Sequence, residues 1–142
     1  MTESGNTSPA VLTLNAGSSS IKWALFRLGA VPVRTATGHI ERIGLPDGIA
    51  TVTDVVTGQQ ERRVVPVPNH VAAVRFLRDQ LAQSSKGLYI QAIGHRVVHG
   101  GSRYADPQVI STEGMGELRR LSPYDPEHLP AEITLIDAFG TE

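Results

Sequence analysis

A polar turn near the amino terminus has the composition of an anion-binding loop. It is the segment Asn15-Ala16-Gly17-Ser18-Ser19-Ser20-Ile21-Lys22. Gly17 permits a sharp turn and the close approach of a ligand. Successive backbone N–H groups in such a turn can bind an anion, and Lys22 adds a point charge that suits phosphate. The segment differs from a P-loop, because Gly-Lys-Ser/Thr is missing and a strand follows. The simpler alternative is a polar hairpin turn with an exposed lysine.

A second segment has residues suited to a short carboxylic acid. It is Gly94-His95-Arg96-Val97-Val98-His99-Gly100-Gly101. In a strand, Arg96 and Val98 would share one face. The guanidinium would then bind the carboxylate oxygens, and Val98 would contact the methyl group. His95 and His99 would lie on the other face, roughly 13 Å apart, too far to share a zinc ion. We expect both histidines to serve the core or to form hydrogen bonds.

A third segment combines an aromatic residue, charges and two prolines. It is Ser122-Pro123-Tyr124-Asp125-Pro126-Glu127-His128. The order of Asp125, Pro126 and Glu127 predicts a helix start, with an acidic N-cap and proline at the first position. The apolar residues Leu129, Ile133 and Ile136 would then line one face. The sequence leaves open whether His128 also faces a site.

Strands must position the first two segments, and the sequence predicts a meander of them. The predicted strands are residues 11–14, 21–28, 33–43, 49–56, 62–67, 89–98 and 109–110. The first two are close enough to form a β-hairpin, and so are the fourth and fifth. The charges Glu61, Arg62 and Arg63 favour an exposed or edge position for the fifth strand. Residues 89–98 have the composition of a buried strand.

Helices are predicted after the hairpins. Asn69 is a good N-cap for a helix running to Gln83, and Gly87 would end it. The apolar residues at helical spacing within it are Val71, Val74, Leu77 and Leu81. Thr112 would cap a second helix, which carries Met115, Leu118 and Leu121. Strands followed by helix, strand and helices predict an α/β domain with a mixed sheet and flanking helices.

Composition excludes several classes of protein. The chain has 142 residues, the usual size of one domain. Its 13 basic and 14 acidic residues give a net charge of −1, so no basic excess indicates nucleic acid. Absence of cysteine excludes disulfides, thiolate zinc sites and cysteine nucleophiles. No apolar run approaches the roughly 18 residues of a membrane span. Residues 1–10 are polar and are expected to form a short disordered tail.

Taken together, residues 11–22 and 94–101 closely resemble the acetate kinase family. The first segment is similar to its N-terminal phosphate hairpin, and the second to its second motif, in the same order. The resemblance spans residues 11–139. It implies an actin- and sugar-kinase-like (ribonuclease H-like) fold, with residues 11–142 as the N-terminal domain. A full member would be more than twice this long, with two domains around a cleft.

The resemblance implies reversible phosphoryl transfer between ATP and a short-chain carboxylate such as acetate, with Mg²⁺ as cofactor and acetyl phosphate as product. The positions implied to bind phosphate or nucleotide are Asn15, Gly17, Ser18, Ser19, Ser20 and Lys22. Asn15 would also face the metal. Arg96 and Lys22 would be catalytic, with Arg96 on the carboxylate or the phosphoryl group and Val98 lining the acyl pocket. The family further implies a cytoplasmic location and a homodimer of the full-length protein.

This sequence departs from the family pattern in two respects. Where the family has a Pro-Leu-His-Asn/Gln-Pro type segment, whose histidine contacts the phosphoryl group, this chain has Pro123-Tyr124-Asp125-Pro126. An ionised Asp125 cannot donate a hydrogen bond, and the role is not transferred to His128. The family's acidic metal ligands, second arginine and adenosine pocket would lie beyond Glu142. We therefore expect these 142 residues to be inactive alone.

Other interpretations stay open. A non-catalytic phosphate-binding or anion-binding module, or a remnant of a kinase, would keep the polar turn without the reaction. A propionate or butyrate kinase would share the motifs and differ in the volume of its acyl pocket. A domain without its partner should also expose apolar surface, so we expect self-association through the face of Leu129, Ile133 and Ile136.

Overall fold

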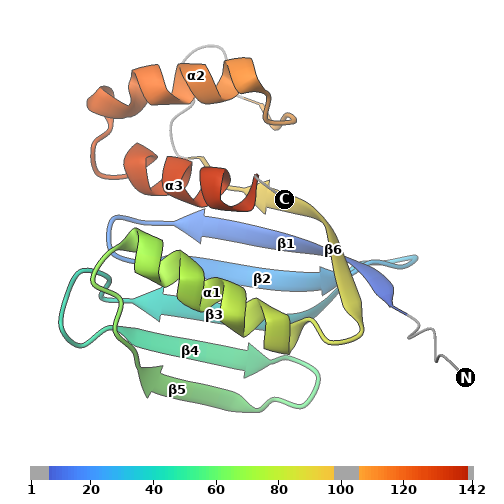
Figure 1. The fold of residues 1–142 in the computed structure, drawn as a ribbon. Helices are drawn as coiled ribbons and strands as arrows, with labels where there is room; N and C mark the ends of the chain where they lie inside the picture. Colours follow the sequence, from blue (N-terminus) through green and yellow to red (C-terminus); the bar gives the residue numbers. More distant parts are fainter. Residues whose placement is uncertain (1–6, 98–105, 141–142) are drawn as a thin grey trace, which may run out of the picture.

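The computed structural model describes residues 7–97 and 106–140 and contains a six-stranded sheet (Figure 1). The strands are β1 (Ser8–Ala16), β2 (Ile21–Arg27), β3 (Val33–Glu41), β4 (Ile49–Asp54), β5 (Gln60–Val64) and β6 (Leu88–His95). Their order across the sheet is β5-β4-β3-β2-β1-β6, and only the β1–β6 pair is parallel. The helices are α1 (His70–Ser84), α2 (Thr112–Leu121) and α3 (Leu129–Phe139). This is the predicted α/β domain with a mixed sheet.

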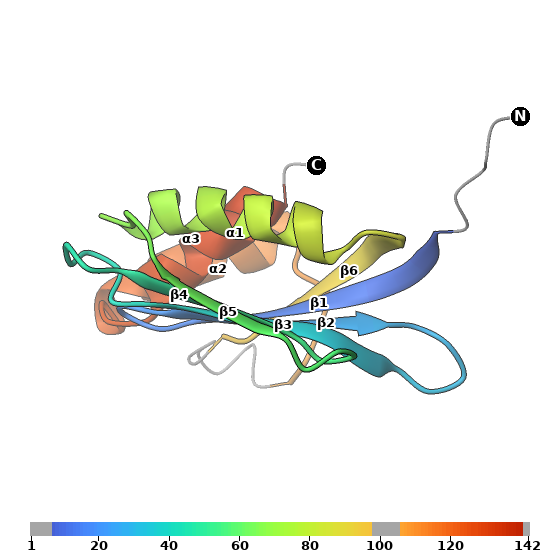
Figure 2. The ribbon, with the colours of Figure 1, turned by 90° about the horizontal axis from the view of Figure 1, so that it is seen from below.

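The helices α1 and α3 lie on the same face of the sheet (Figure 2). Alternation along the strands follows from this arrangement, because one face is covered and the other is open. In β1, for example, Leu12 and Leu14 are buried beneath the helices while Thr13 is exposed. The predicted hairpins β1–β2 and β4–β5 are confirmed, and β5 is an edge strand as its charges indicated.

Three strand predictions differ from the structure. β1 begins at Ser8, so it includes three residues expected in the tail; pairing with both β2 and β6 extends it, and Ala10 is fully buried. β6 is an edge strand with a half-exposed pattern, because helices cover only one face of the sheet. Val109 and Ile110 belong to no strand and are exposed.

The helix α1 confirms the predicted cap. The Asn69 side chain accepts a hydrogen bond from the Ala72 amide at 2.9 Å, which satisfies one of the free N–H groups of the first turn. Buried Val74, Leu77 and Leu81 form its core face, whereas Val71, predicted on the same stripe, is exposed. Gly87 follows the helix at φ +77°, and the chain then enters β6 beside β1.

The two C-terminal helices begin at other residues than predicted. Ser111, rather than Thr112, caps α2 by accepting from the Gly114 amide at 3.0 Å. The helix α3 begins at Leu129, so Asp125 is not its N-cap and Pro126 is not in its first turn. A 3₁₀ turn over Ser122–Tyr124 ends at Asp125, and that carboxylate contacts His128 instead.

The core has two parts. The larger lies between the sheet and the helices α1 and α3, and the smaller lies between α2 and α3. Leu129, Ile133 and Ile136 are at most 8% exposed, because they pack against Leu118 of α2. The expectation that this face is open for self-association is therefore wrong. No helix in the described part of the chain is long and apolar enough to cross a membrane.

Candidate functional site

The polar turn joins β1 to β2 and is closed by its own backbone. The Gly17 amide donates to the Ser20 carbonyl at 2.7 Å. Asn15, the next-to-last residue of β1, lies directly opposite Lys22 in the hairpin register. The hairpin therefore brings these two side chains to the same face at the same end of the sheet.

One of the reasons for a glycine at position 17, a left-handed backbone conformation, does not apply in the structure. The φ of Gly17 is not positive, so the turn does not require the left-handed region there. A Cβ at this position would lie 3.0 Å from the Ser20 hydroxyl oxygen. A side chain at position 17 would therefore press on the Ser20 hydroxyl group, which would have to shift by a few tenths of an ångström.

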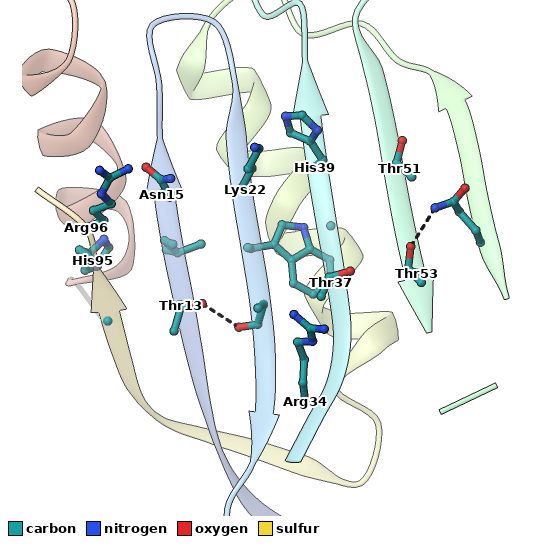
Figure 3. A pocket seen from close by; sticks show the side chains of 16 residues that line it. Thr13, Asn15, Lys22, Arg34, Thr37, His39, Thr51, Thr53, His95 and Arg96 are labelled. Carbon is teal, nitrogen blue, oxygen red and sulfur yellow. Dashed lines mark hydrogen bonds between the residues drawn. The ribbon is translucent and has the colours of Figure 1, made fainter. Parts of the chain in front are cut away.

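The second segment contributes Arg96 to the same end of the sheet. The Arg96 amide donates to the Leu14 carbonyl at 2.9 Å, which continues the parallel β1–β6 pairing one residue beyond His95. Figure 3 shows Arg96, Asn15 and Lys22 in a row, with Arg96 just beyond the end of β6 and the other two on β1 and β2. Lys22 and Arg96 are exposed, and among the described residues neither forms an ion pair.

These side chains surround a hollow of about 330 Å³. Its lining residues are Asn15, Ala16, Gly17, Ser20, Lys22, Arg96 and His128. Two uncompensated cations beside backbone amides favour an anionic ligand, because a charge-assisted hydrogen bond is stronger than a neutral one. The structure thus brings together both segments that the sequence singled out.

His128 is the site residue that sequence reasoning left open. Its Nδ1 lies 3.0 Å from a carboxylate oxygen of Asp125, whose side chain is mostly buried. The hydrogen bond to Asp125 raises the pKa of His128 above its ordinary value, and the nearby carboxylates of Asp125, Glu127 and Glu132 raise this pKa further. When it is protonated, the imidazole carries a positive charge at the edge of the hollow that is paired with the Asp125 carboxylate. The spacing of Asp125 and His128 was the only signal in the sequence.

Several predicted site residues lie elsewhere. Ser18 and Ser19 are exposed at the tip of the turn and do not line the hollow. Val98, predicted to line an acyl pocket, lies outside the described residues, as does His99. His95 pairs with Leu14 in the sheet, and its burial lowers its pKa. His95 is half-buried and also lines a broader hollow on the sheet, so it is not a fully buried core residue.

A broader hollow of about 750 Å³ extends over the open face of the sheet and shares Asn15, Lys22 and Arg96 with the first (Figure 3). Polar side chains from the other strands continue it, among them His39 and Arg34. Burial lowers the pKa of His39, while Glu41 raises it and Lys22 lowers it. The smaller hollow therefore opens onto a surface that carries polar side chains from several strands.

The residues of the hollow offer few ligands for a metal ion. The described residues contain no group of three or more histidine, cysteine, aspartate or glutamate side chains that could hold one. Asn15 offers a single neutral oxygen, and Lys22 and Arg96 line the same hollow. Mg²⁺ prefers several oxygen ligands, including carboxylates and phosphate. The described residues therefore do not form a magnesium site by themselves.

Comparison with known sequences gives one consistent result. The model of the acetokinase family matches residues 10–142. The acetate kinase of Anoxybacillus flavithermus is 41% identical over 136 residues, which cover 92% of this chain and 33% of that protein. The acetate kinase of Bacillus cytotoxicus is also 41% identical, over 132 residues. The chain thus spans about a third of the length of the curated relatives it matches.

Solved structures agree with the sequence comparison. Acetate kinase from Porphyromonas gingivalis superposes with a TM-score of 0.79 at 31% identity, covering 92% of this chain and 33% of that one. A propionate kinase from Francisella tularensis gives a TM-score of 0.77 at 26% identity, with the same coverage. Both have the actin-like fold expected from the sequence. The range matched by the family model, residues 10–142, includes the polar turn, β6 and all three helices.

Proposed function

The chain belongs to the acetokinase family, and on that premise we propose that it is the phosphate-binding part of a carboxylate kinase. The reaction would be reversible phosphoryl transfer between ATP and a short-chain carboxylate. One observation carries this proposal: Asn15, Lys22 and Arg96, from three neighbouring strands, line a single hollow with uncompensated positive charge.

The residues of the hollow suit this reaction without a protein nucleophile. A carboxylate oxygen of the acid would attack the γ-phosphorus of ATP, and the bond from that phosphorus to the β–γ bridging oxygen would break to release ADP. The transferring group carries its charge on three equatorial oxygens, so catalysis needs positioning and charge neutralisation. Lys22, Asn15 and the turn would bind the phosphates. Arg96 would bind the carboxylate or the group in transit.

His128 has the chemistry to assist Arg96. When the imidazole is protonated, both ring nitrogens carry a hydrogen, so Nδ1 donates to Asp125 and Nε2 can donate to a second acceptor. Where the family pattern has a histidine, this chain has Asp125, and the structure places His128 on the hollow. We assign His128 as a donor to an anionic oxygen there.

The rest of the protein would complete the site. The chain spans about a third of its relatives, and in a protein of their length the Mg²⁺ ligands, the second arginine and the adenosine pocket would come from the other two thirds. Mg²⁺ would enter with the nucleotide and neutralise phosphate charge, with Asn15 as one oxygen ligand. A homodimer of the full-length protein in the cytoplasm, where ATP is available, completes the proposal.

The acid is proposed as a class, not as one compound. An acetate kinase and a propionate kinase superpose on this chain with nearly equal TM-scores. Arg96 would recognise the carboxylate that both acids share. The volume of the acyl pocket would choose between them, and acids of two, three and four carbons would measure it.

Binding by the purified chain tests the anion site. Titration of inorganic phosphate and acetyl phosphate, followed by amide chemical shifts at constant ionic strength, gives both dissociation constants. Lys22→Ala should weaken both ligands about tenfold, the effect of one charge-assisted hydrogen bond. Lys86→Ala, an exposed lysine beyond α1, is the matched control and should change neither constant. Unchanged binding in Lys22→Ala would contradict the proposal.

The same titration distinguishes a kinase from an anion-binding module. A kinase site should prefer acetyl phosphate to inorganic phosphate, and Arg96→Ala should remove that preference. Arg75→Ala, on the exposed face of α1, is the matched control. Equal affinity for the two ligands in the wild type would support the module. Formation of acyl phosphate from ATP, Mg²⁺ and acetate by the chain would overturn the expectation of inactivity.

A further inference from the structure

The polar turn between β1 and β2 has its carbonyl groups engaged by the protein. The Ser20 carbonyl accepts from the Gly17 amide at 2.7 Å, and the Ser19 carbonyl accepts from the Ile43 amide at 3.0 Å. The Gly17 carbonyl lies 3.1 Å from Nε2 of His70, the first residue of α1. A carbonyl oxygen can only accept, so the Nε2 hydrogen belongs to His70.

The amide groups of the same turn are not used in this way. Among the described residues, the amides of Ser18, Ser19 and Ser20 donate no hydrogen bond. In a trans peptide the N–H points away from the preceding C=O. Holding the Gly17 carbonyl toward α1 therefore directs the Ser18 amide away from His70, and the contact from Ile43 acts in the same way on the Ser20 amide. An anion needs hydrogen-bond donors, and this arrangement engages the carbonyl acceptors with the protein while it leaves the amide donors available.

His70 itself is well anchored. The Asn69 cap fixes the first turn of α1, and His70 is half-buried there. It reaches across 53 positions of sequence to the turn, so this contact ties α1 to the β1–β2 hairpin. Ile43 reaches the turn through its backbone, which any residue could provide. His70 is the one side chain among the described residues that bonds to the backbone of the turn.

We propose that His70 is a positioning residue for the phosphate-binding turn. By donating from Nε2 to the Gly17 carbonyl, it sets the orientation of the Gly17–Ser18 peptide, with the Ser18 amide directed away from α1, and so holds the turn whose residues Gly17 and Ser20 line the hollow. This inference deepens the proposed function and rests on it, since the anion to be bound is the phosphate of that reaction. His70 does not line the hollow and would not touch the ligand.

The test uses three variants of the chain. His70→Ala removes the donor, and His70→Gln replaces it with an amide N–H that can bond the same carbonyl. Val71→Ala changes the exposed neighbour on α1 and is the matched control. Each variant is measured in two ways: the backbone ¹⁵N heteronuclear NOE of residues 18–20 without ligand, and the dissociation constant for inorganic phosphate. Thermal unfolding is recorded for all of them, so that a loss of folding is recognised.

We expect His70→Ala to lower the heteronuclear NOE of the turn and to weaken phosphate binding about three- to tenfold, the usual effect of one lost hydrogen bond. His70→Gln should restore both within about twofold of the wild type, and Val71→Ala should change neither. A purely structural role would instead lower the unfolding temperature of His70→Ala and leave phosphate binding by the folded protein unchanged.

The outcomes separate this inference from the proposed function. An unchanged NOE and unchanged binding in His70→Ala would overturn the positioning role while phosphate binding itself persists. A lower NOE with unchanged binding would also overturn it. If the wild type binds no phosphate but His70→Ala still lowers the NOE, the proposed anion site is wrong, whereas the conclusion that His70 orders the turn is supported. If the wild type binds no phosphate and His70→Ala also leaves the NOE unchanged, both the anion site and the positioning role are wrong.

Discussion

Gly38 is the position at which one methyl group should do the most damage to the sheet. It lies opposite Trp23, the single tryptophan of the chain, where β3 pairs with β2. A Cβ on Gly38 would come within 2.5 Å of three indole atoms, Nε1, Cε2 and Cζ2. Non-bonded carbon atoms are most favourable at about 3.5–4.0 Å. Trp23 is only 4% exposed, so the ring must leave its place or the strands must separate.

The magnitude follows from the size of that overlap. Overpacking a core by a methyl group costs typically about 1–3 kcal/mol when neighbours can adjust. Here the added atom overlaps a rigid ring at three points, and displacing the ring resembles the loss of a buried aromatic side chain, about 3–5 kcal/mol. We therefore expect Gly38→Ala to lower the free energy of unfolding by about 3–5 kcal/mol. That is a large part of the ~5–15 kcal/mol typical of a domain.

Urea unfolding measures this directly, because Trp23 is the only tryptophan and reports on its own site. Gly116→Ala is the matched control: it lies within α2, a Cβ there meets nothing within 4 Å, and alanine should stabilise the helix by about 0.5–1 kcal/mol. Trp23→Leu in the Gly38→Ala background should recover part of the loss, measured by circular dichroism. An unfolding midpoint of Gly38→Ala equal to that of the wild type would refute the argument.

Two further predictions concern histidines. Asp125→Asn should lower the pKa of His128, because it removes the hydrogen bond and charge that raise it; an imidazole NMR titration measures this, and an unchanged midpoint would contradict the assigned pair. Since this pKa is raised in the fold, the stability it contributes is present below the ordinary value of 6.5 and is lost as pH rises through the folded value. The contribution of His95 to stability depends on pH in the opposite direction. Burial lowers its pKa, so the unfolded chain binds the proton more readily than the folded chain. The free energy of unfolding should therefore fall as pH drops below about 6.5. Urea unfolding from pH 8 to pH 5 should show this fall in the free energy of unfolding. If a His95→Asn variant shows the same pH dependence as the wild type, the fall arises from another titratable group.

Local patterns in the sequence were sufficient for most elements. The alternation around Trp23 predicted β2, the short polar segment predicted the β1–β2 hairpin, and Asn69 predicted the start of α1. Each of these depends on residues near each other in the chain. The prediction that Asp125 caps a helix was wrong because its carboxylate could either cap the helix or bond to His128, and the two interactions exclude each other. The preceding 3₁₀ turn placed it where His128 could donate to it.

The sequence by itself determined the two polar segments and their order, and it predicted an anionic ligand for them, because these inferences depend on residue type and near-neighbour spacing. Only the tertiary structure decided that they share one hollow. The crossover through α1 returns the chain to β1 and sets Arg96 beside Asn15. Packing of α3 likewise places His128 on that hollow, and the start of α1 sets His70 against Gly17. Such contacts join residues distant in sequence, and burial of the apolar faces of the sheet and helices fixes which of them meet.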